Sequence, residues 1–138
     1  MTGVAHAARS FALAILALML TTGVALAQEK EAFTAERFAE LQEQNALILL
    51  DVFADWCPTC ALQQDILDDY VAAHPDVPLH ILQIDFDRQK EYVRRFSAPR
   101  QSTFILYQGE ERIWFSVAET DADVIVGRLN EAAADGTR

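Results

Sequence analysis

The stretch of sequence that decides the fold reads LILLDVFADWCPTC and spans residues 47–60. Its first seven residues, Leu47–Phe53, are apolar at six positions, which is typical of a strand buried on both faces in a parallel sheet covered by helices. Two cysteines, Cys57 and Cys60, follow this strand with two residues between them. The segment therefore predicts an α/β fold in which a cysteine pair lies at the end of a buried strand.

A helix is expected to begin at the cysteine pair. Cys57 takes the N-cap position and Pro58 the first helical position, where the missing N–H of proline costs nothing. The helix N-terminus stabilises the Cys57 thiolate and lowers its pKa, and the thiolate is the form that attacks a disulfide. Cys60, one turn further on, is placed to attack the resulting mixed disulfide. We therefore expect a nucleophile, Cys57, and a resolving thiol, Cys60, rather than a structural bridge, which would close a very short loop and stabilise little.

Asp51 is the one polar residue in the strand before the cysteines. An acid in an otherwise apolar strand is expensive to ionise, so its pKa is expected to be raised. A carboxyl group of raised pKa is suited to acid–base chemistry. The alternative is a tolerated polar residue near the end of a strand.

Helical periodicity is found on both sides of this strand. Thr34 is the expected N-cap of a helix that reaches Gln44, with Phe33 and Phe38 as a hydrophobic staple. The helix after the cysteines is expected to end at His74. The residues predicted to face inward from this second helix are Leu62, Ile66, Leu67, Tyr70 and Val71.

The C-terminal half completes an alternating order of elements. Thr120, with Asp123 three residues later, resembles a capping box that opens a last helix, and Gly136 is expected to end it. The complete order is α-β-α-β-α-β-β-α, in which strands joined by helices are expected to lie parallel and the chain closes on an antiparallel pair. The elements before the last helix are predicted as a strand at 79–84, a helix at 87–96, and strands at 103–107 and 112–117 joined as a hairpin.

Residues 1–27 have the layout of a secretory signal peptide. The basic residue Arg9 precedes an apolar run at 11–20, and Ala25-Leu26-Ala27 provides an A-x-A cleavage site. The competing interpretation is a membrane helix, for which the run is short. Cleavage after Ala27 would leave one domain at 28–138, in which no second apolar segment of spanning length follows.

The chain is acidic, with 21 Asp and Glu residues against 11 Lys and Arg residues and a formal net charge of −10. This charge argues against nucleic acid as a partner. The basic residues concentrate in one region, which either borders the site and contacts an acidic partner or forms a solvated helix face. They are Arg88, Lys90, Arg94, Arg95 and Arg100.

Residues 51–60, with the order of elements around them, resemble the active-site region of the thioredoxin family, and the resemblance covers essentially all of 28–138. The stretch Ala54-Asp55-Trp56-Cys57 is similar to the C-terminal thioredoxin-like domain of bacterial DsbD-type thiol transporters. The resemblance implies a thioredoxin-like α/β fold, a mixed central sheet flanked by helices, and a thiol–disulfide oxidoreductase without a cofactor. It also implies that Asp51 passes a proton to or from Cys60. The implied substrate contacts are Trp56, for which ordinary aromatic packing is an equal alternative, Pro58, Thr59, Gln101 and Ser102.

The sequence departs from the thioredoxin family opposite the cysteines. The family places a cis-proline there, and aligning the strand at 103–107 puts Ser102 at that position. A shifted loop in which Ala98-Pro99 takes the role is the alternative. With Ser102 there, the peptide bond is expected to be trans and substrate docking would differ from that of the family. A missing proline would also leave the cysteines more open to a metal ion, although two cysteines fall short of the four ligands of a closed zinc site.

We therefore expect a monomeric thiol–disulfide oxidoreductase, in a bacterial periplasm or secreted, that exchanges disulfides with protein substrates. The resemblance favours the reducing direction, with electrons from a membrane thiol transporter. The alternative is a metal-handling or non-catalytic binding module on the same fold. No metal ligand set is assigned.

Overall fold

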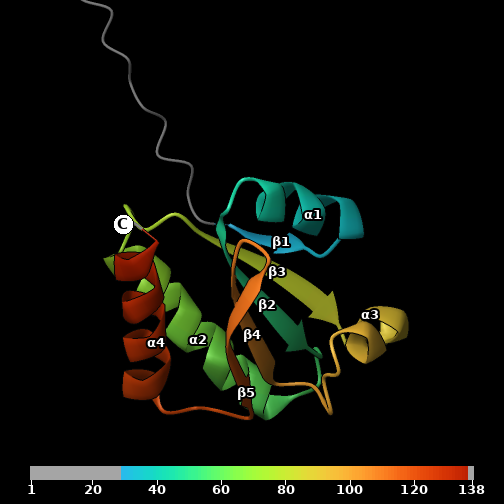
Figure 1. The fold of residues 1–138 in the computed structure, drawn as a ribbon. Coiled ribbons are helices and arrows are strands. Elements are labelled where there is room, and N and C mark those ends of the chain that lie inside the picture. Colours follow the sequence, from blue (N-terminus) through green and yellow to red (C-terminus); the bar gives the residue numbers. More distant parts are fainter. Residues whose placement is uncertain (1–28, 137–138) are drawn as a thin grey trace, which may run out of the picture.

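A five-stranded mixed sheet lies at the centre of the molecule, with helices on both of its faces (Figure 1). The computed structural model describes residues 29–136, so the predicted signal peptide and the cleavage site after Ala27 lie outside the described residues. The strand order is β1-β3-β2-β4-β5. In chain order the elements are β1 (Lys30–Ala32), α1 (Ala35–Glu43), β2 (Leu47–Phe53), α2 (Pro58–Ala73), β3 (Leu79–Asp85), α3 (Lys90–Arg95), β4 (Thr103–Gln108), β5 (Glu111–Val117) and α4 (Ala122–Asp135).

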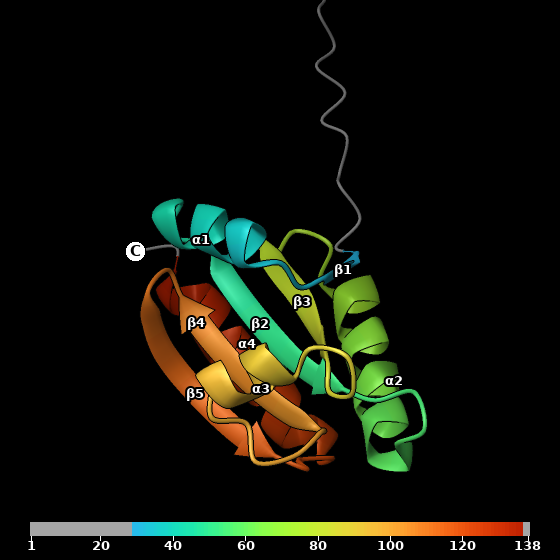
Figure 2. The same cartoon turned by 90° about the vertical axis from the view of Figure 1, so that its right-hand side faces the viewer.

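The predicted strand Leu47–Phe53 is β2, the central strand of the sheet. It pairs parallel with β3, where Phe53 lies opposite Asp85, and antiparallel with β4, where Val52 lies opposite Thr103. The end of β2, the end of β3 and the start of β4 therefore meet at one edge of the sheet (Figure 2). The chain continues from this edge directly into the cysteine pair.

Two features of the topology differ from the prediction. β1 pairs parallel with β3 and was not predicted, because its three residues, Lys30, Glu31 and Ala32, carry no apolar alternation. β4 was expected to run parallel to β2 and runs antiparallel instead. The connection that contains α3 begins and ends at the same edge of the sheet, so the chain enters β4 in the reverse direction.

Each face of the sheet carries its own apolar core. α1 and α3 cover one face, toward which Ile48, Leu50 and Val52 of β2 point. α2 and α4 cover the other face, toward which Leu47 and Leu49 point. β2 is apolar almost throughout because alternate residues supply both cores.

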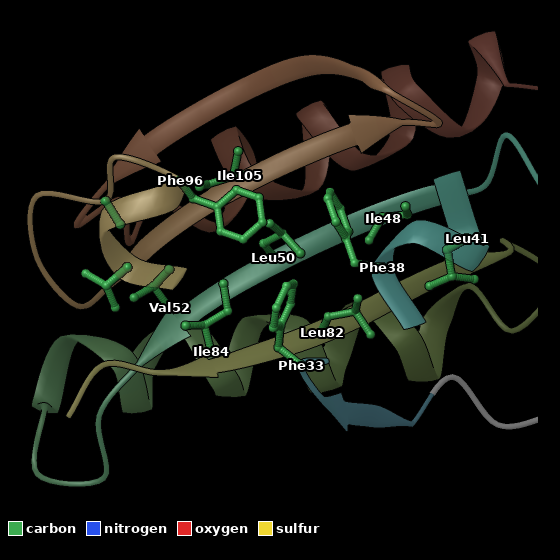
Figure 3. Close-up of a cluster of buried hydrophobic side chains, with 12 residues drawn as sticks. Phe33, Phe38, Leu41, Ile48, Leu50, Val52, Leu82, Ile84, Phe96 and Ile105 are labelled. Atoms are coloured by element: carbon green, nitrogen blue, oxygen red, sulfur yellow. The ribbon is translucent and has the colours of Figure 1, made fainter. Parts of the chain in front are cut away.

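The first core confirms the predicted start of α1. Thr34 caps the helix by accepting the backbone N–H of Arg37 at 3.1 Å. The rings of Phe33 and Phe38, which flank this cap, have centroids 5.8 Å apart and form the predicted hydrophobic staple. Figure 3 shows both rings in the core on this face of the sheet, together with Phe96.

α2 begins at Pro58 and has His74 as its C-cap, as predicted. Four of the five residues predicted to face inward are buried or partly buried. The prediction for Leu62 was wrong, since its side chain is 55% exposed. Gln63 is buried in its place because its amide donates to the carbonyl of Glu119 at 2.8 Å.

α3 is shorter than the helix predicted at 87–96. The carboxylate of Asp85 accepts the backbone N–H groups of Asp87 and Arg88, each at 2.9 Å, and these bonds form a turn where the helix was expected to begin. Val93 and Phe96 are buried in the core.

α4 begins one residue later than predicted. Asp121, not Thr120, is the N-cap, because its carboxylate accepts the N–H of Asp123 at 2.9 Å. The helix ends at Asp135 with Gly136 as its C-cap, as expected, and it buries Ile125 and Leu129. Among residues 29–136, none of the helices combines the length and the apolar character that crossing a bilayer requires.

The predicted hairpin is confirmed, since β4 and β5 pair antiparallel. Gly109 lies in its turn at a φ of +56°, in the left-handed region. A Cβ atom at this position would lie 2.5 Å from Oδ1 of Asn45, so the turn needs glycine for space as well as for conformation.

Candidate active site

Cys57 and Cys60 lie where β2 passes into α2. Cys57 is the N-cap of α2, with an extended backbone, and its Sγ accepts the backbone N–H of Cys60 at 3.1 Å. Pro58 occupies the start of the helix, as predicted. The N–H of Cys57 donates to the carbonyl of Ala54 at 3.1 Å and holds the turn that carries the pair. Both cysteines are buried and unbridged.

Ser102 stands opposite the two cysteines. Its Oγ lies 3.1 Å from Sγ of Cys57 and 3.2 Å from Sγ of Cys60. Pro99, in the alternative alignment, is an exposed residue of the preceding loop. The structure therefore places Ser102, and not the 98–99 pair, at the position opposite the cysteines.

The backbone of Ser102 could not be that of a proline. Its φ is +61°, whereas proline is held near −65°. Its N–H donates to the carbonyl of Val52 at 2.7 Å, and proline has no N–H to donate. A proline at this position would therefore need a different backbone in this loop.

Opposing effects set the pKa of Cys57. Burial raises the pKa, and hydrogen bonds lower it, from the thiol of Cys60, the hydroxyl of Ser102, the backbone N–H of Cys60 and the side chain of Gln101. The hydrogen bonds prevail, so the pKa of Cys57 lies below its ordinary value. The direction agrees with the prediction, and Ser102 and Gln101 are donors that the prediction did not include.

Cys60 behaves in the opposite way. Burial raises its pKa, and so does the neighbouring Cys57, while the hydroxyl of Ser102 and the backbone of Ala54 lower it only in part. Cys60 therefore favours the protonated thiol. The pair is asymmetric, with the thiolate favoured at Cys57 and the thiol at Cys60.

Asp51 lies fully buried in β2. Its Oδ2 accepts the side-chain amides of Gln64 at 2.7 Å and Gln83 at 3.0 Å, while its Oδ1 has no hydrogen-bond partner. Burial raises the pKa of Asp51, and the two amides and the charge of Lys30 offset this only in part. The raised pKa agrees with the prediction.

Gln64 and Gln83 were not predicted as site residues. The two amides also bond each other at 3.0 Å, and we call them the amide pair. Gln83 lies opposite Asp51 in the register of β2 and β3. The one signal in the sequence is that Gln83, like Asp51, interrupts an apolar strand.

A pocket of about 330 Å³ opens beside the cysteines. Cys57 and Cys60 line it together with Gln64 and Gln83. The two cysteines and the amide pair that holds Asp51 therefore line the same pocket.

The predicted substrate contacts surround the cysteines at the surface. Trp56 is 61% exposed, and its Nε1 donates to Oδ2 of Asp87 at 2.7 Å, so its ring is not packed in a core. Pro58 is exposed, and Thr59 and Gln101 are half-buried. Ser102 differs from them because its side chain is fully buried.

Two of the five residues of the basic region, Arg88 and Lys90, form ion pairs with acids. Arg88 lies 3.1 Å from the carboxylate of Asp85, and Lys90 lies 3.6 Å from that of Asp87. Lys90 also lies over the ring of Phe86, which packs against the cysteine region. The ion pairs are typical of a solvated helix face, while Lys90 also borders the site through Phe86.

Within residues 29–136, no group of three or more His, Cys, Asp or Glu side chains is arranged to hold a metal ion. The ligands that the site itself offers are the sulfur atoms of Cys57 and Cys60. A closed tetrahedral zinc site needs four.

A sheet whose central strand leads into an asymmetric cysteine pair at a helix N-terminus defines the class of thiol–disulfide oxidoreductases with an α/β fold. Residues 28–131 match the family model described as Thioredoxin, and the chain belongs to the thioredoxin family. The predicted α/β thioredoxin-like fold, the membership of the thioredoxin family and the thiol–disulfide oxidoreductase activity are thereby confirmed.

Individual proteins similar to this chain include thioredoxins. The thioredoxin of Chlamydia trachomatis is 28% identical over 96 residues, which cover 70% of this chain and 91% of that protein. The thioredoxin of Chlamydia muridarum is 30% identical over 87 residues, covering 63% of this chain and 83% of that protein. Among solved structures, Trxlp of Edwardsiella tarda is 32% identical, with a TM-score of 0.69, over 73% of this chain and 98% of that one.

Proposed function

We propose that the protein reduces disulfide bonds of exported protein substrates through Cys57 and Cys60. The asymmetry of the pair carries this proposal: the pKa of Cys57 is lowered, and that of buried Cys60 is raised. A nucleophile must be ionised before it attacks, whereas a resolving thiol should stay protonated until the first step is complete.

In the first step the Cys57 thiolate attacks one sulfur of the substrate disulfide. The substrate S–S bond breaks, a Cys57–substrate disulfide forms, and the other substrate sulfur leaves as a thiolate that takes a proton from solvent. In the second step Cys60 loses its proton and its thiolate attacks Sγ of Cys57. The Cys57–substrate bond breaks as the Cys57–Cys60 disulfide forms, and the second substrate sulfur leaves as a thiolate that takes a proton from solvent. Two electrons have then passed from the protein to the substrate.

Asp51 accepts the proton of Cys60 in this scheme. Its raised pKa suits a group that must take up and later return a proton near neutral pH. Its unpartnered Oδ1 is the oxygen free to carry that proton, because Oδ2 already accepts the amide pair. The pocket shared by Cys60 and the amide pair supports a route through solvent between the two groups.

The substrate is proposed to dock over the exposed ring of Trp56 and along Pro58, Thr59 and Gln101. These residues border the cysteines on the surface, which suits a protein substrate that presents an extended segment. Ser102 is proposed to support this surface from inside the protein through the backbone of its loop, since its side chain is buried.

We propose that the activity lies outside the cytoplasm, in a bacterial periplasm or secreted, with electrons from a membrane thiol transporter. The signal-peptide pattern of residues 1–27 supports the location, and the resemblance of 54–57 to DsbD-type domains supports the donor and the reducing direction. The protein is proposed to act as a monomer, because both cysteines, Asp51 and Ser102 come from one chain.

Turnover of a protein disulfide tests the proposal. Cys57→Ser should abolish turnover, and Cys60→Ser should accumulate a mixed disulfide with the substrate, visible on a non-reducing gel. Asp69→Asn, on the exposed face of the same helix, is the matched control and should retain turnover.

The direction is tested by equilibration with glutathione. A reductase should have a reduction potential below about −180 mV, the value typical of protein disulfide isomerase. A protein that neither reduces nor oxidises disulfides, but holds stoichiometric metal through both cysteines, would be the metal-handling module instead.

A further inference from the structure

We propose that Ser102 is a catalytic residue whose hydroxyl stabilises two thiolates in turn: that of Cys57 before attack and that of Cys60 during resolution. The proposal rests on the proposed function and deepens it. It assigns to the residue that replaces the family's proline a role that proline, which has no hydroxyl, could not perform.

The hydroxyl of Ser102 is held between the two sulfur atoms. Its Oγ lies 3.1 Å from Sγ of Cys57 and 3.2 Å from Sγ of Cys60, and the residue is fully buried. No other hydrogen-bond partner of this hydroxyl is present among residues 29–136. The two distances are nearly equal, so the hydroxyl can donate a hydrogen bond to either sulfur without movement of the backbone.

The backbone of Ser102 is fixed by its own hydrogen bonds. Its N–H donates to Val52 at 2.7 Å, and its carbonyl accepts the N–H of Ala118 at 2.7 Å and the amide of Gln63 at 3.4 Å. These bonds anchor the loop to β2, α2 and the segment after β5. They hold a left-handed φ of +61°, which a serine adopts only when its surroundings impose it. The hydroxyl is therefore preorganised toward the sulfur atoms.

A hydroxyl has one proton to donate and lone pairs to accept with. Before attack, Ser102 donates its hydroxyl proton to the Cys57 thiolate. Sγ of Cys57 then accepts three donors, the hydroxyl of Ser102 and the thiol and backbone N–H of Cys60. Charge-assisted bonds of this kind favour the thiolate.

After attack, the Cys57 sulfur belongs to the mixed disulfide and carries no negative charge. The hydroxyl proton then turns about the Cβ–Oγ bond toward Sγ of Cys60, 3.2 Å away, as Cys60 gives its own proton to Asp51 or solvent. Ser102 keeps its proton throughout, and no electron passes through it. Its hydroxyl also lowers the pKa of both thiols, in keeping with bonds to either sulfur.

The test separates the two sulfurs. Ser102→Ala is introduced into Cys60→Ala, where only Cys57 titrates, and into Cys57→Ala, where only Cys60 titrates. The thiol pKa in each background is followed by the ultraviolet absorbance of the thiolate. We expect both acid dissociation constants to fall about tenfold, the effect of one charge-assisted hydrogen bond. If Cys57 shifts and Cys60 does not, or if neither shifts, the proposal is overturned.

Two further variants separate the hydroxyl from the backbone. Ser102→Gly also lacks the hydroxyl but favours the left-handed φ, so it should shift both pKa values as much as alanine does. Thr103→Val removes the neighbouring buried hydroxyl, which donates to the carbonyl of Arg100 at 2.7 Å and touches neither sulfur. This control should leave both pKa values unchanged. A shift with Thr103→Val equal to that with Ser102→Ala would assign the effect to the loop and overturn the proposal.

The failure of this inference can be told apart from failure of the proposed function. The pKa measurements need no substrate, so they report on Ser102 whether or not the protein reduces disulfides. Loss of turnover with Cys57→Ser tests the function independently. If turnover depends on Cys57 but the pKa values of Cys57 and Cys60 are unchanged by Ser102→Ala, the role of Ser102 is refuted and the proposed function is not.

Discussion

Replacing Gln83 by leucine should destabilise the protein increasingly as the pH rises. Gln83 donates one amide hydrogen bond to buried Asp51 at 3.0 Å. The loss of this hydrogen bond lowers the free energy of unfolding by about 1 kcal/mol when the carboxyl is neutral and by about 1.5–3 kcal/mol when it is ionised. The added loss on ionisation is therefore about 0.5–2 kcal/mol, which corresponds to a further rise of about one unit in the pKa of Asp51.

The sign follows from the raised pKa of Asp51 in the folded protein. In the unfolded chain the pKa of this carboxyl is about 3.9. Its contribution to stability is fully present below that pH and is lost as the pH rises through the folded pKa. In Gln83→Leu the pKa of Asp51 in the folded protein is higher than in the parent. The variant therefore loses more stability than the parent as the pH rises.

Urea unfolding of both proteins between about pH 4 and about pH 9 measures the effect, because the titration of other groups cancels in the difference between them. Gln89→Leu is the matched control: this amide donates to the neutral carbonyl of Phe33 at 3.1 Å, so its loss should not depend on the pH. A destabilisation by Gln83→Leu that is the same at every pH would refute the idea that Gln83 holds an ionisable Asp51.

Three other predictions concern packing, the turn and the substrate surface. Leu67→Ala should cost about 2–5 kcal/mol in urea unfolding because Leu67 is fully buried, whereas Leu62→Ala, at an exposed position, should stay within about 0.5 kcal/mol of the parent. Gly109→Ala should lower the stability by at least about 1 kcal/mol, since a Cβ would meet Asn45 and the φ is positive; an unchanged melting temperature would contradict this. Trp56→Ala should leave the unfolding free energy within about 0.5 kcal/mol of the parent but raise KM for a protein disulfide more than it lowers kcat. A loss confined to kcat would argue against a docking role.

The centre of the fold could be predicted because its signals are local. β2 is apolar over seven residues except at Asp51, and Pro58 marks the start of α2 directly after Cys57. These two signals were sufficient to predict the asymmetric cysteine pair. The raised pKa of Asp51 followed from the apolar strand that contains it.

The features that the sequence did not reveal depend on partners far away in the chain. Gln63 is buried because the carbonyls of Glu119 and Ser102 need a donor, which spacing within one helix cannot show. The position of Gln83 beside Asp51 is set by the register of β2 and β3, and Gln64 reaches both from α2. The left-handed backbone of Ser102 is imposed by bonds to three separate elements, and β1 is a strand only because β3 offers a free edge.

The pH dependence of alkylation at the cysteines tests the central claim most directly. The reduced protein is treated with substoichiometric iodoacetamide over a pH series, and the modified sulfur is identified by mass spectrometry. The asymmetric pair predicts that Cys57 is modified first, with an apparent pKa below the value of about 8.5 for an ordinary cysteine, while Cys60 stays unmodified. Equal modification of both sulfurs, or an apparent pKa for Cys57 at or above the ordinary value, would contradict it.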